Sequence, residues 1–390
     1  MNRPVNAAGE VLAGLPKLLA GLDASVSERE RERRLPYESI DLIRQSGVLS
    51  LRIPTDCGGA GGTIKDQLDA VVAIASVDSN VAQAIRPHFF FVEELRTNGT
   101  QPSCDRWWPE LATGTLVGNA LSESAAGRPG MIETRLVPNP NGGWTIDGVK
   151  SYSTGSLFSD LLLVSANDWD GAERLALIPS DRPGIEIADG MGQRTTATGT
   201  TTLRGVRVDA DELVEMVSLK EKFTHIGGHR QLYLAAVLAG IAADACNDVR
   251  EYVRNRARVS AHGVTAKPVD DPYVLHAVGD ISSAASASRA VVLGAADALD
   301  EAAEAGTEAA ALQAAVDVAR AQVAVAALVL PATQRVFDVG GASAVTDSVN
   351  LHRHWRNART VVAHNPLDYK RRVIGDWVIN AVEPPRNSYF

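Results

Sequence analysis

The strongest constraint on the fold is that the sequence pattern changes twice along the chain. Before Gly114 apolar residues recur at helical spacing, as in VLAGLPKLLAGL at residues 11–22. Residues 115–215 hold short alternating or apolar runs, such as GWTIDGVKSYSTG and DLLLVSAND, separated by Gly, Pro, Asn and Asp. That pattern is typical of strands and hairpins. From Gly227 three long Ala-rich segments with periodic Leu, Val and Ile return to helical spacing.

We therefore predict a mainly α, α+β protein with three domains. These are an N-terminal helical domain (residues 1–114), a middle β domain (115–215) and a C-terminal helical bundle domain (216–390). The chain of 390 residues is longer than one compact core usually serves. A last helix is expected over residues 367–382. The small and apolar side chains of the long helices permit close packing and predict further burial between subunits, in a homotetramer or dimer.

Composition excludes several classes of protein. A net charge of −9 and a pI near 5.5 argue against a nucleic-acid partner. The three cysteines (Cys57, Cys104, Cys246) are far apart and form no CxxC pair, so neither a disulfide framework nor a zinc site is expected. The N-terminus lacks the order of a signal peptide, and no apolar run of membrane-spanning length is evident. We expect a cytoplasmic protein with no membrane partner.

A metal site is also not expected. His352 and His354 are two residues apart, so on a helix their side chains point apart. The sequence suggests no carboxylate that would complete a set of ligands.

Three local motifs connect this pattern to a known family. ALSESAAG at residues 120–127 is similar to the flavin-loop motif of the acyl-CoA dehydrogenases. GVKSYSTG at 148–155 is similar to their G-x-K-x-W-I-T-N segment, with Tyr152 in place of Trp. VGG at 339–341, followed by HRHWRNAR, resembles their GG-turn and R-D-A segment. The resemblance implies an acyl-CoA dehydrogenase-like fold, in which a middle β-barrel or sandwich precedes a C-terminal four-helix bundle.

One departure from the family pattern bears on the chemistry. In acyl-CoA dehydrogenases a Glu after the R-D-A segment abstracts the α-proton of the substrate, and the alignment puts His364-Asn365-Pro366 there. Because Asn has no ionisable carboxylate, α,β-dehydrogenation is not expected. An acyl-CoA dehydrogenase or oxidase with a relocated base, such as Glu221 or Asp244, stays as the alternative. A scaffold that binds no flavin is the third reading.

The segment HWRNARTVVAHNP instead resembles the two-component flavin-dependent monooxygenases of this fold. The resemblance implies reduced flavin (FADH2 or FMNH2), O2 and a C4a-hydroperoxyflavin, with a separate NAD(P)H:flavin reductase as partner. The expected substrate is an aromatic or heteroaromatic small molecule. Hydroxylation of an indole-like ring carbon is the first choice, and N- or S-oxygenation stays open. Sulfur-oxidising members carry a second histidine where this chain has Val361, which disfavours a dibenzothiophene-like substrate.

The resemblance also implies the site residues. His364, His88 and Ser153 are the catalytic candidates, because an imidazole can donate a hydrogen bond or move a proton near neutral pH. The stretch after His88 would line the substrate pocket, with plain core packing as the alternative: Phe89, Phe90, Phe91 and Val92. The expected flavin contacts are Ser122, Ser124, Tyr152, Ser153, Thr154, Arg256, Arg258, Phe337, Gly340, Gly341, Arg359 and Asn365.

Two kinds of flavin contact are expected among these residues. Tyr152 would cover the ring face, and the hydroxyls of Ser153 and Thr154 would bond to it. Arg256 matches an arginine that contacts the pyrophosphate of FAD in the family. Arginines can also hold a phosphate by paired hydrogen bonds, and the candidates for this are Arg258, Arg353, Arg356 and Arg359.

Overall fold

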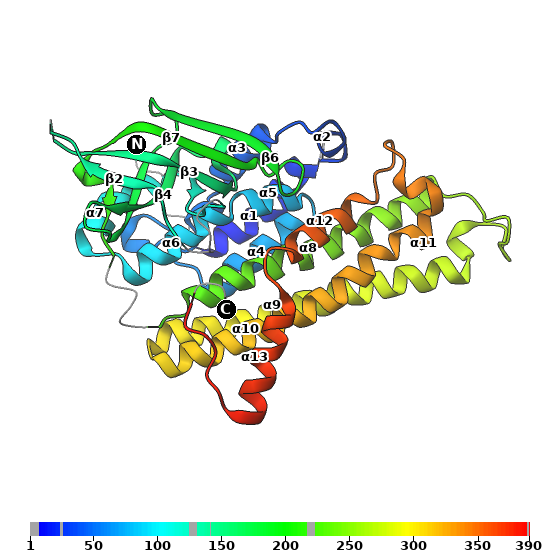
Figure 1. Cartoon of the computed structure of the whole chain (residues 1–390). Coiled ribbons are helices and arrows are strands. Elements are labelled where there is room, and N and C mark those ends of the chain that lie inside the picture. Colours follow the sequence, from blue (N-terminus) through cyan, green and yellow to red (C-terminus); the bar gives the residue numbers. More distant parts are fainter. Residues whose placement is uncertain (1–7, 24–25, 125–130, 141, 217–222, 388–389) are drawn as a thin grey trace. The chain divides into compact units, whose positions relative to one another are not determined.

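The computed structural model describes residues 8–23, 26–124, 131–140, 142–216, 223–387 and 390. The chain forms two compact units, whose helices and strands are labelled in Figure 1. Unit 1 comprises Met1–Leu18, Leu35–Thr63 and Gln83–Lys222. Unit 2 comprises Leu19–Arg34, Ile64–Ala82 and Phe223–Phe390.

The helices of unit 1 bury apolar side chains. α1 (Ala8–Asp23) begins in this unit, and α3 (Tyr37–Ser46) ends at Gly47, whose φ of 81° suits a residue without a Cβ. α6 (Arg86–Asn98) and α7 (Gln101–Leu111) bury Phe91, Leu95 and Trp107 in a shared cluster. The glycine-rich stretch after Ile53 forms a short 3₁₀ turn (Thr55–Cys57) and a connector.

Within the described residues, eight strands of unit 1 form one mixed sheet with the order β6-β7-β3-β2-β4-β5-β8, and β1 pairs with β4. β1 and β2 run parallel to β4, and the other neighbours are antiparallel. The strands are β1 (Val117–Ala120), β2 (Arg135–Pro138), β3 (Trp144–Ser153), β4 (Leu161–Asp168), β5 (Glu173–Pro179), β6 (Ile185–Met191), β7 (Thr198–Val208) and β8 (Leu213–Val214). All of them lie within the region predicted to be β-structured.

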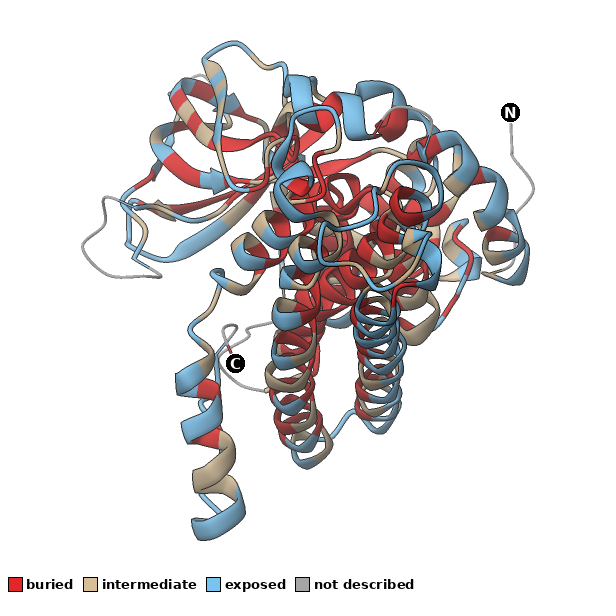
Figure 2. Ribbon diagram, turned by 90° about the vertical axis from the view of Figure 1, so that its right-hand side faces the viewer, coloured by how far each residue is buried: buried red, intermediate tan, exposed pale blue. Residues whose placement is uncertain are grey.

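Unit 2 is built on three long helices that lie side by side, α8 (Ile226–Asn255), α9 (Pro272–Ala305) and α10 (Glu308–Gln334). Asp271 caps α9 by accepting hydrogen bonds from the N–H groups of Tyr273 and Val274. Buried positions form stripes along these helices in Figure 2, as their sequence spacing predicts. The remaining helices of the unit are α2 (Val26–Glu32), α4 (Ile64–Ala75), α11 (Val336–Gly340), α12 (Arg353–Val362) and α13 (Leu367–Asn380).

The prediction of a mainly α, α+β protein is confirmed, but the chain divides differently from the three predicted domains. Part of the N-terminal helical region, including α4, belongs to the unit of the C-terminal helices. The reason is a close backbone contact between α4 and α8. A Cβ added at Gly240 would lie 2.3 Å from the Cβ of Ala75, so only glycine allows this approach. Helical periodicity gives no sign of which core a helix joins.

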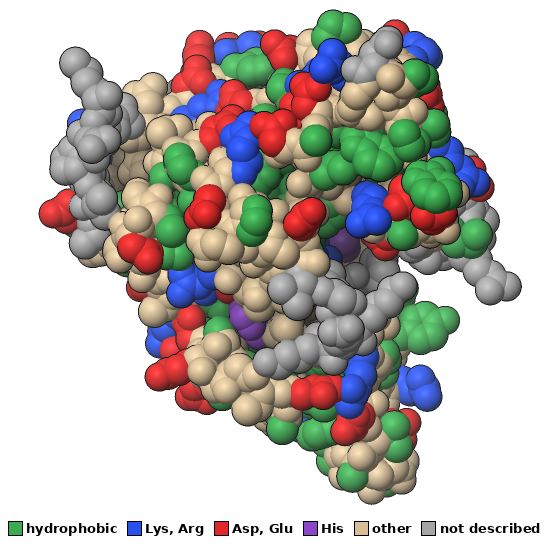
Figure 3. Space-filling model, turned by 90° about the vertical axis from the view of Figure 1, so that its left-hand side faces the viewer, with side chains coloured by type: hydrophobic (Ala, Val, Ile, Leu, Met, Phe, Trp, Pro, Cys, Tyr) green, Lys and Arg blue, Asp and Glu red, His purple; other side chains and the backbone are tan. Residues whose placement is uncertain are grey.

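Among the described residues, two helical segments of unit 2 are long and apolar enough to cross a membrane, whereas none was expected from the sequence. They are Ile226–Asn255 and Glu308–Val345, and 78% and 56% of their most apolar windows are buried inside the protein. Both are core helices, which pass a test of length and composition because the helix packing of this unit is itself apolar. Acidic and basic side chains are interspersed on the face shown in Figure 3.

The contact at Gly240 leads to a stability prediction. Gly240→Ala should lower the free energy of unfolding by about 1–3 kcal/mol, because the added methyl group overlaps Ala75 and the Val72 carbonyl oxygen. The matched control is Gly294→Ala in α9, where nothing lies within 4 Å of the added Cβ. That variant should gain about 0.5–1 kcal/mol, because alanine restricts the unfolded chain. Urea unfolding measures both, and equal effects would contradict the close α4–α8 contact.

Candidate functional site

Two chain segments that the sequence assigned to flavin lie together in unit 1. Residues 121–124 follow β1, and residues 151–154 end β3. The N–H of Ser151 donates to the carbonyl oxygen of Ser122 at 2.7 Å, and the hydroxyls of Ser124 and Ser151 are 2.8 Å apart. The structure thus brings Ser122 and Ser124 beside the β3 end. Residues 125–127 of the flavin-loop motif lie outside the described residues.

Tyr152 has an unusual backbone. Its φ is +58°, and its side chain is 57% exposed. The register of β3 against β7 shifts between Lys150 and Ser153, so the strand bulges at this tyrosine. A bulky residue in the left-handed region costs about 1–3 kcal/mol and persists only where its surroundings hold it. Such strain at an exposed aromatic ring points to a binding role for that ring.

The next two residues carry hydroxyls with different surroundings. Ser153 is fully buried, and within the described residues its Oγ has no hydrogen-bond partner. Thr154 Oγ1 accepts a hydrogen bond from Thr198 Oγ1 at 3.1 Å. Because buried hydroxyls almost always have a partner, the unpaired Ser153 Oγ would suit a ligand that offers it a hydrogen bond. A flavin ring, with its carbonyl oxygens and ring nitrogens, fits this requirement.

His88 on α6 is buried and neutral. Its Nε2 lies 2.9 Å from the carbonyl oxygen of Leu49. Since a carbonyl oxygen only accepts, Nε2 carries the proton and Nδ1 is an acceptor. Burial lowers the pKa of His88 to about 4, against a weaker opposing effect of the Leu49 bond. Within the described residues Nδ1 has no partner. His88 can therefore accept a hydrogen bond from a ligand near neutral pH.

The residues that follow His88 are mostly core residues. Phe89, Phe91 and Val92 are fully buried, and Phe91 and Val92 belong to the cluster around Trp107. Phe90 is partly buried and packs against the same cluster. Core packing thus accounts for Phe91 and Val92, and the Phe89 ring meets the His88 ring edge-on, with centroids 5.7 Å apart.

In unit 2 the turn after α12 presents His364. This histidine is exposed, and its backbone N–H donates to the carbonyl oxygen of Val361 at 3.2 Å. Asn365, expected to contact flavin, instead turns its amide inward and donates to Gln231 Oε1 at 2.5 Å. Gln322 on α10 donates to the Gln231 carbonyl oxygen at 2.8 Å. The His364 turn is therefore bonded to Gln231 of α8, to which Gln322 of α10 is also bonded. Gln231 was not among the residues predicted from the sequence.

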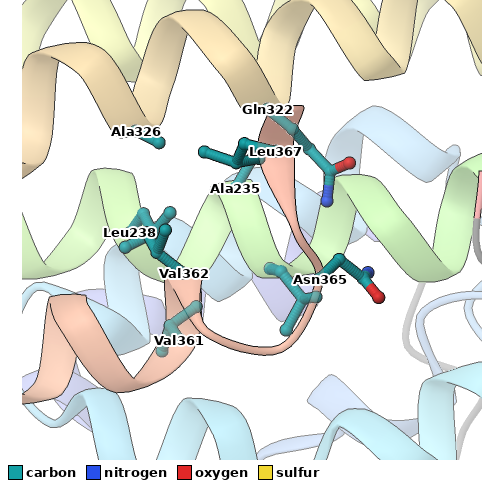
Figure 4. A pocket seen from close by; sticks show the side chains of 9 residues that line it. Ala235, Leu238, Gln322, Ala326, Val361, Val362, Asn365 and Leu367 are labelled. Atoms are coloured by element: carbon teal, nitrogen blue, oxygen red, sulfur yellow. The ribbon is translucent and has the colours of Figure 1, made fainter. Parts of the chain in front are cut away.

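A small apolar cavity lies beside this turn (Figure 4). Its volume is about 20 Å³, which is room for roughly one water molecule. By itself it is far smaller than a pocket for an aromatic ligand. It is lined by Leu234, Ala235, Leu238, Gln322, Ala326, Val361, Val362, Asn365 and Leu367.

The arginines of α12 and those just after α8 divide into paired and unpaired side chains. Arg353 is buried and lies 2.6 Å from Asp248, and Arg356 pairs with Glu30 of α2. These two side chains already pair with carboxylates of their own unit, so they are less suited to hold a phosphate than the exposed arginines. Arg359 and Arg258 are exposed, and within the described residues no partner occupies either. Arg256 Nη1 donates to the Ser348 carbonyl oxygen at 3.3 Å.

The remaining expected flavin contacts lie near the end of α11. Phe337 packs against the cluster around Val249 and Tyr252. Gly340 is the last residue of α11, and a Cβ there would lie 2.8 Å from the Cβ of Ala344. Gly341 has a φ of +52°, which favours glycine. The GG-turn is therefore required by the local chain path.

The histidine of α12 does have carboxylate neighbours, contrary to the sequence analysis. His354 Nε2 is 2.9 Å from Asp248, and His354 Nδ1 is 3.5 Å from Asp244. Ligand atoms of the three residues lie within 4.8 Å of one another, which a metal ion could span. Arg353 already supplies the positive charge at this point. We interpret the group as an ion-pair cluster.

Burial sets the protonation of this cluster. It lowers the pKa of His354 to about 4 and raises the pKa of Asp244 well above its usual range, although Arg353 opposes the rise at Asp244. Asp244 is thus enclosed among side chains of its own unit. Glu221, the other candidate for a relocated base, lies outside the described residues.

Comparisons with known proteins identify the family of the chain. Residues 20–115 match the family model "Acyl-CoA dehydrogenase, N-terminal domain", and residues 232–369 match "Acyl-CoA dehydrogenase, C-terminal domain". The chain is 32% identical over 403 residues to the probable FMNH2-dependent monooxygenase SfnC of Pseudomonas putida, with 100% of both chains covered.

Solved structures give the same result. TdsC of Paenibacillus sp. A11-2, a dibenzothiophene monooxygenase solved with FMN and indole, is 30% identical, with a TM-score of 0.89, 97% of this chain and 99% of TdsC covered. Methanesulfinate monooxygenase MsuC of Pseudomonas fluorescens is 31% identical, with a TM-score of 0.86 and 97% and 99% covered.

The fold is that of the acyl-CoA dehydrogenases. Within it the chain belongs to the flavin-dependent monooxygenases, enzymes that use reduced flavin and O2.

The protonation of His88 predicts how stability depends on pH. As pH falls from about 6.5 to about 4, His88 binds a proton in the unfolded chain but not in the folded one. The folded state therefore loses stability over this range. His88→Gln keeps a donor for Leu49 and removes this titration. Between about pH 7 and pH 4.5 the free energy of unfolding should fall less in this variant than in the wild type. The two decreases should differ by about 2 kcal/mol. The control is His262→Gln, at an exposed histidine. Parallel pH profiles for His88→Gln and the wild type would contradict the neutral His88.

Proposed function

We propose that this chain is the oxygenase component of a two-component system that uses FMNH2 to hydroxylate an aromatic or heteroaromatic small molecule. An indole-like ring is the first choice. The observation that carries the substrate class is the likeness over 97% of the chain to TdsC, which was solved with FMN and indole. The neutral His88 supports it, because its acceptor nitrogen suits a substrate that carries an N–H or O–H group.

The residues of this chain would hold and orient the reactants. Reduced flavin supplies the electrons that activate O2, so that one oxygen atom enters the substrate and the other leaves as water. Tyr152 would cover the flavin ring, and the unpaired hydroxyl of Ser153 would bond to it. Arg258 and Arg359 carry unpaired charge in the described structure that suits the phosphate of FMN. His364 would move a proton at the exposed turn.

Further parts of the proposal concern partners and compartment. A separate NAD(P)H:flavin reductase would deliver the reduced flavin. The chain would work in the cytoplasm as a homotetramer or dimer. The three free thiols are consistent with a reducing compartment.

S-oxygenation is the second candidate. TdsC and MsuC are described as monooxygenases of dibenzothiophene and methanesulfinate, which are sulfur compounds. Val361, in place of a second histidine, argues against dibenzothiophene, and it is a buried residue lining the small cavity.

The experiment that tests the function supplies the purified protein with a flavin reductase, NADH, FMN and ¹⁸O2. Indole, dibenzothiophene and methanesulfinate are offered in parallel, and products are identified by mass spectrometry. One ¹⁸O atom in hydroxylated indole supports the proposal. Labelled sulfoxide or sulfonate alone would favour the second candidate. Bleaching of bound oxidised flavin by an acyl-CoA, without oxygenated product, would overturn both.

Binding of the FMN phosphate can be tested separately from binding of the flavin ring. Arg258→Ala and Arg359→Ala should each weaken FMN binding about tenfold, since each loses a hydrogen bond between charged groups. Riboflavin, which lacks the phosphate, should bind these variants as it binds the wild type. Arg320→Ala, at an exposed arginine paired with Asp317, is the control. Equal losses for FMN and riboflavin would argue against a phosphate contact. Fluorescence quenching on titration measures all of these affinities.

The role of His364 is tested by kinetics. His364→Ala should lower kcat by about a hundredfold, because the proton-transferring side chain is lost, while the affinity for FMN stays unchanged. His276→Ala, at an exposed histidine of α9, should leave both quantities unchanged. A loss of FMN affinity that matches the loss of rate would instead assign His364 to binding.

A further inference from the structure

A buried ion pair joins the two flavin-assigned segments of unit 1. Lys150 of β3 is fully buried, and its Nζ lies 2.6 Å from Glu123 Oε1 and 3.1 Å from Ser165 Oγ. Ser165 in turn donates to the carbonyl oxygen of Leu121 at 2.9 Å. The ammonium group therefore holds residues 121–123 through the Glu123 side chain and through the Leu121 carbonyl oxygen, to which it donates directly at 3.4 Å and by way of Ser165.

Glu123 is held from its other side by the two residues that precede β2. Its Oε1 accepts from Thr134 Oγ1 at 2.7 Å, and its Oε2 accepts from the N–H of Glu133 at 2.8 Å. A Cβ at Gly148 would lie 2.2 Å from Thr134 Oγ1, so glycine is needed for Thr134 to reach this position. Both Gly148 and Lys150 of the GVK motif thus serve the same cluster.

The pair adjoins the strained backbone of Tyr152. From Lys150 the chain passes through Ser151, whose N–H and Oγ bond to Ser122 and Ser124, and then enters the left-handed turn at Tyr152. The segment that anchors this turn is the segment that Glu123 fixes. A shift of residues 121–124 would remove the bonds that hold Ser151, and Tyr152 would be free to leave its left-handed conformation.

We propose that Lys150 and Glu123 are positioning residues for the flavin: their ion pair holds residues 121–124 against β3, and so presents the Tyr152 ring and the Ser153 hydroxyl in the geometry that binds flavin. This inference rests on the proposed function, because it assumes that FMN binds at these segments. Neither residue is placed in contact with the flavin itself.

The test compares Lys150→Met with Arg182→Met. The control breaks another largely buried ion pair of the same unit, between Arg182 and Glu212, and within the described residues neither partner bonds to residues 121–124 or 151–154. Binding of oxidised FMN is measured by fluorescence titration, and visible circular dichroism reports how the bound ring is held. Thermal unfolding shows the stability of each variant.

Lys150→Met should weaken FMN binding by about tenfold or more and reduce the induced dichroism toward that of free FMN, because the ring platform is displaced. Arg182→Met should lose stability but keep its affinity within about twofold and its dichroism unchanged. A folded Lys150→Met that binds FMN with wild-type affinity and dichroism overturns the proposal. Should Lys150→Met fail to fold, Glu123→Gln replaces it, because it removes the charge that pairs with Lys150 and keeps an oxygen that can accept from Thr134. Wild-type affinity and dichroism in that variant also overturn the proposal.

A double-mutant cycle separates positioning from general stability. Because Lys150 is proposed to act partly through Tyr152, Lys150→Met should weaken FMN binding clearly less in a Tyr152→Ala background than in the wild type. Additive losses overturn the positioning role. A wild-type protein that binds no FMN at all refutes the proposed function itself, whereas wild-type binding with unaffected variants refutes only this inference.

Discussion

Buried ion pairs fix α12, and the exposed His364 turn depends on that helix. Arg353 and His354 meet Asp248 of α8, and Arg356 meets Glu30 of α2. Removing one partner of such a pair leaves an uncompensated buried charge, at a cost of about 3–5 kcal/mol. The helix therefore cannot slide along α8 without breaking several pairs together. The position at which the His364 turn begins is therefore fixed by α12, although the residues of the turn are largely exposed.

The same physical principle operates in unit 1, on a smaller scale. Lys150 and Glu123 are charged side chains removed from water, and each of them is also bonded to neutral groups. Burial lowers the pKa of Lys150, whereas bonds from Lys150 and its neighbours outweigh burial and lower the pKa of Glu123. Both shifts show that the pair is a balance between desolvation and mutual attraction. Such pairs confer geometry more than stability, which suits segments that must meet a flat ring.

The sequence suggested candidate residues and a chemistry for the site, but it did not indicate how the charged side chains pair. The motif around Tyr152 predicted where the chain turns toward a flavin, and the His364 segment predicted oxygenation over dehydrogenation. The arginines of α12 looked alike in the sequence. Their partners differ because Arg353 faces α8 and Arg356 faces α2, while Arg359 faces outward. Asn365 likewise turns inward to Gln231, a residue that lies 134 positions away.

The sequence by itself determined the order of helical, β and helical regions, because hydrophobic periodicity is a local property. It also determined the family, through short motifs whose residue types are set by a common cofactor. Only the tertiary structure decided that α4 joins the C-terminal helices, since that depends on Gly240 meeting Ala75 across the fold. It also decided which charges are paired and which stay open to a ligand. Two charged side chains pair only if they are close in space. For residues far apart in the sequence, sequence spacing does not show whether they are close in space.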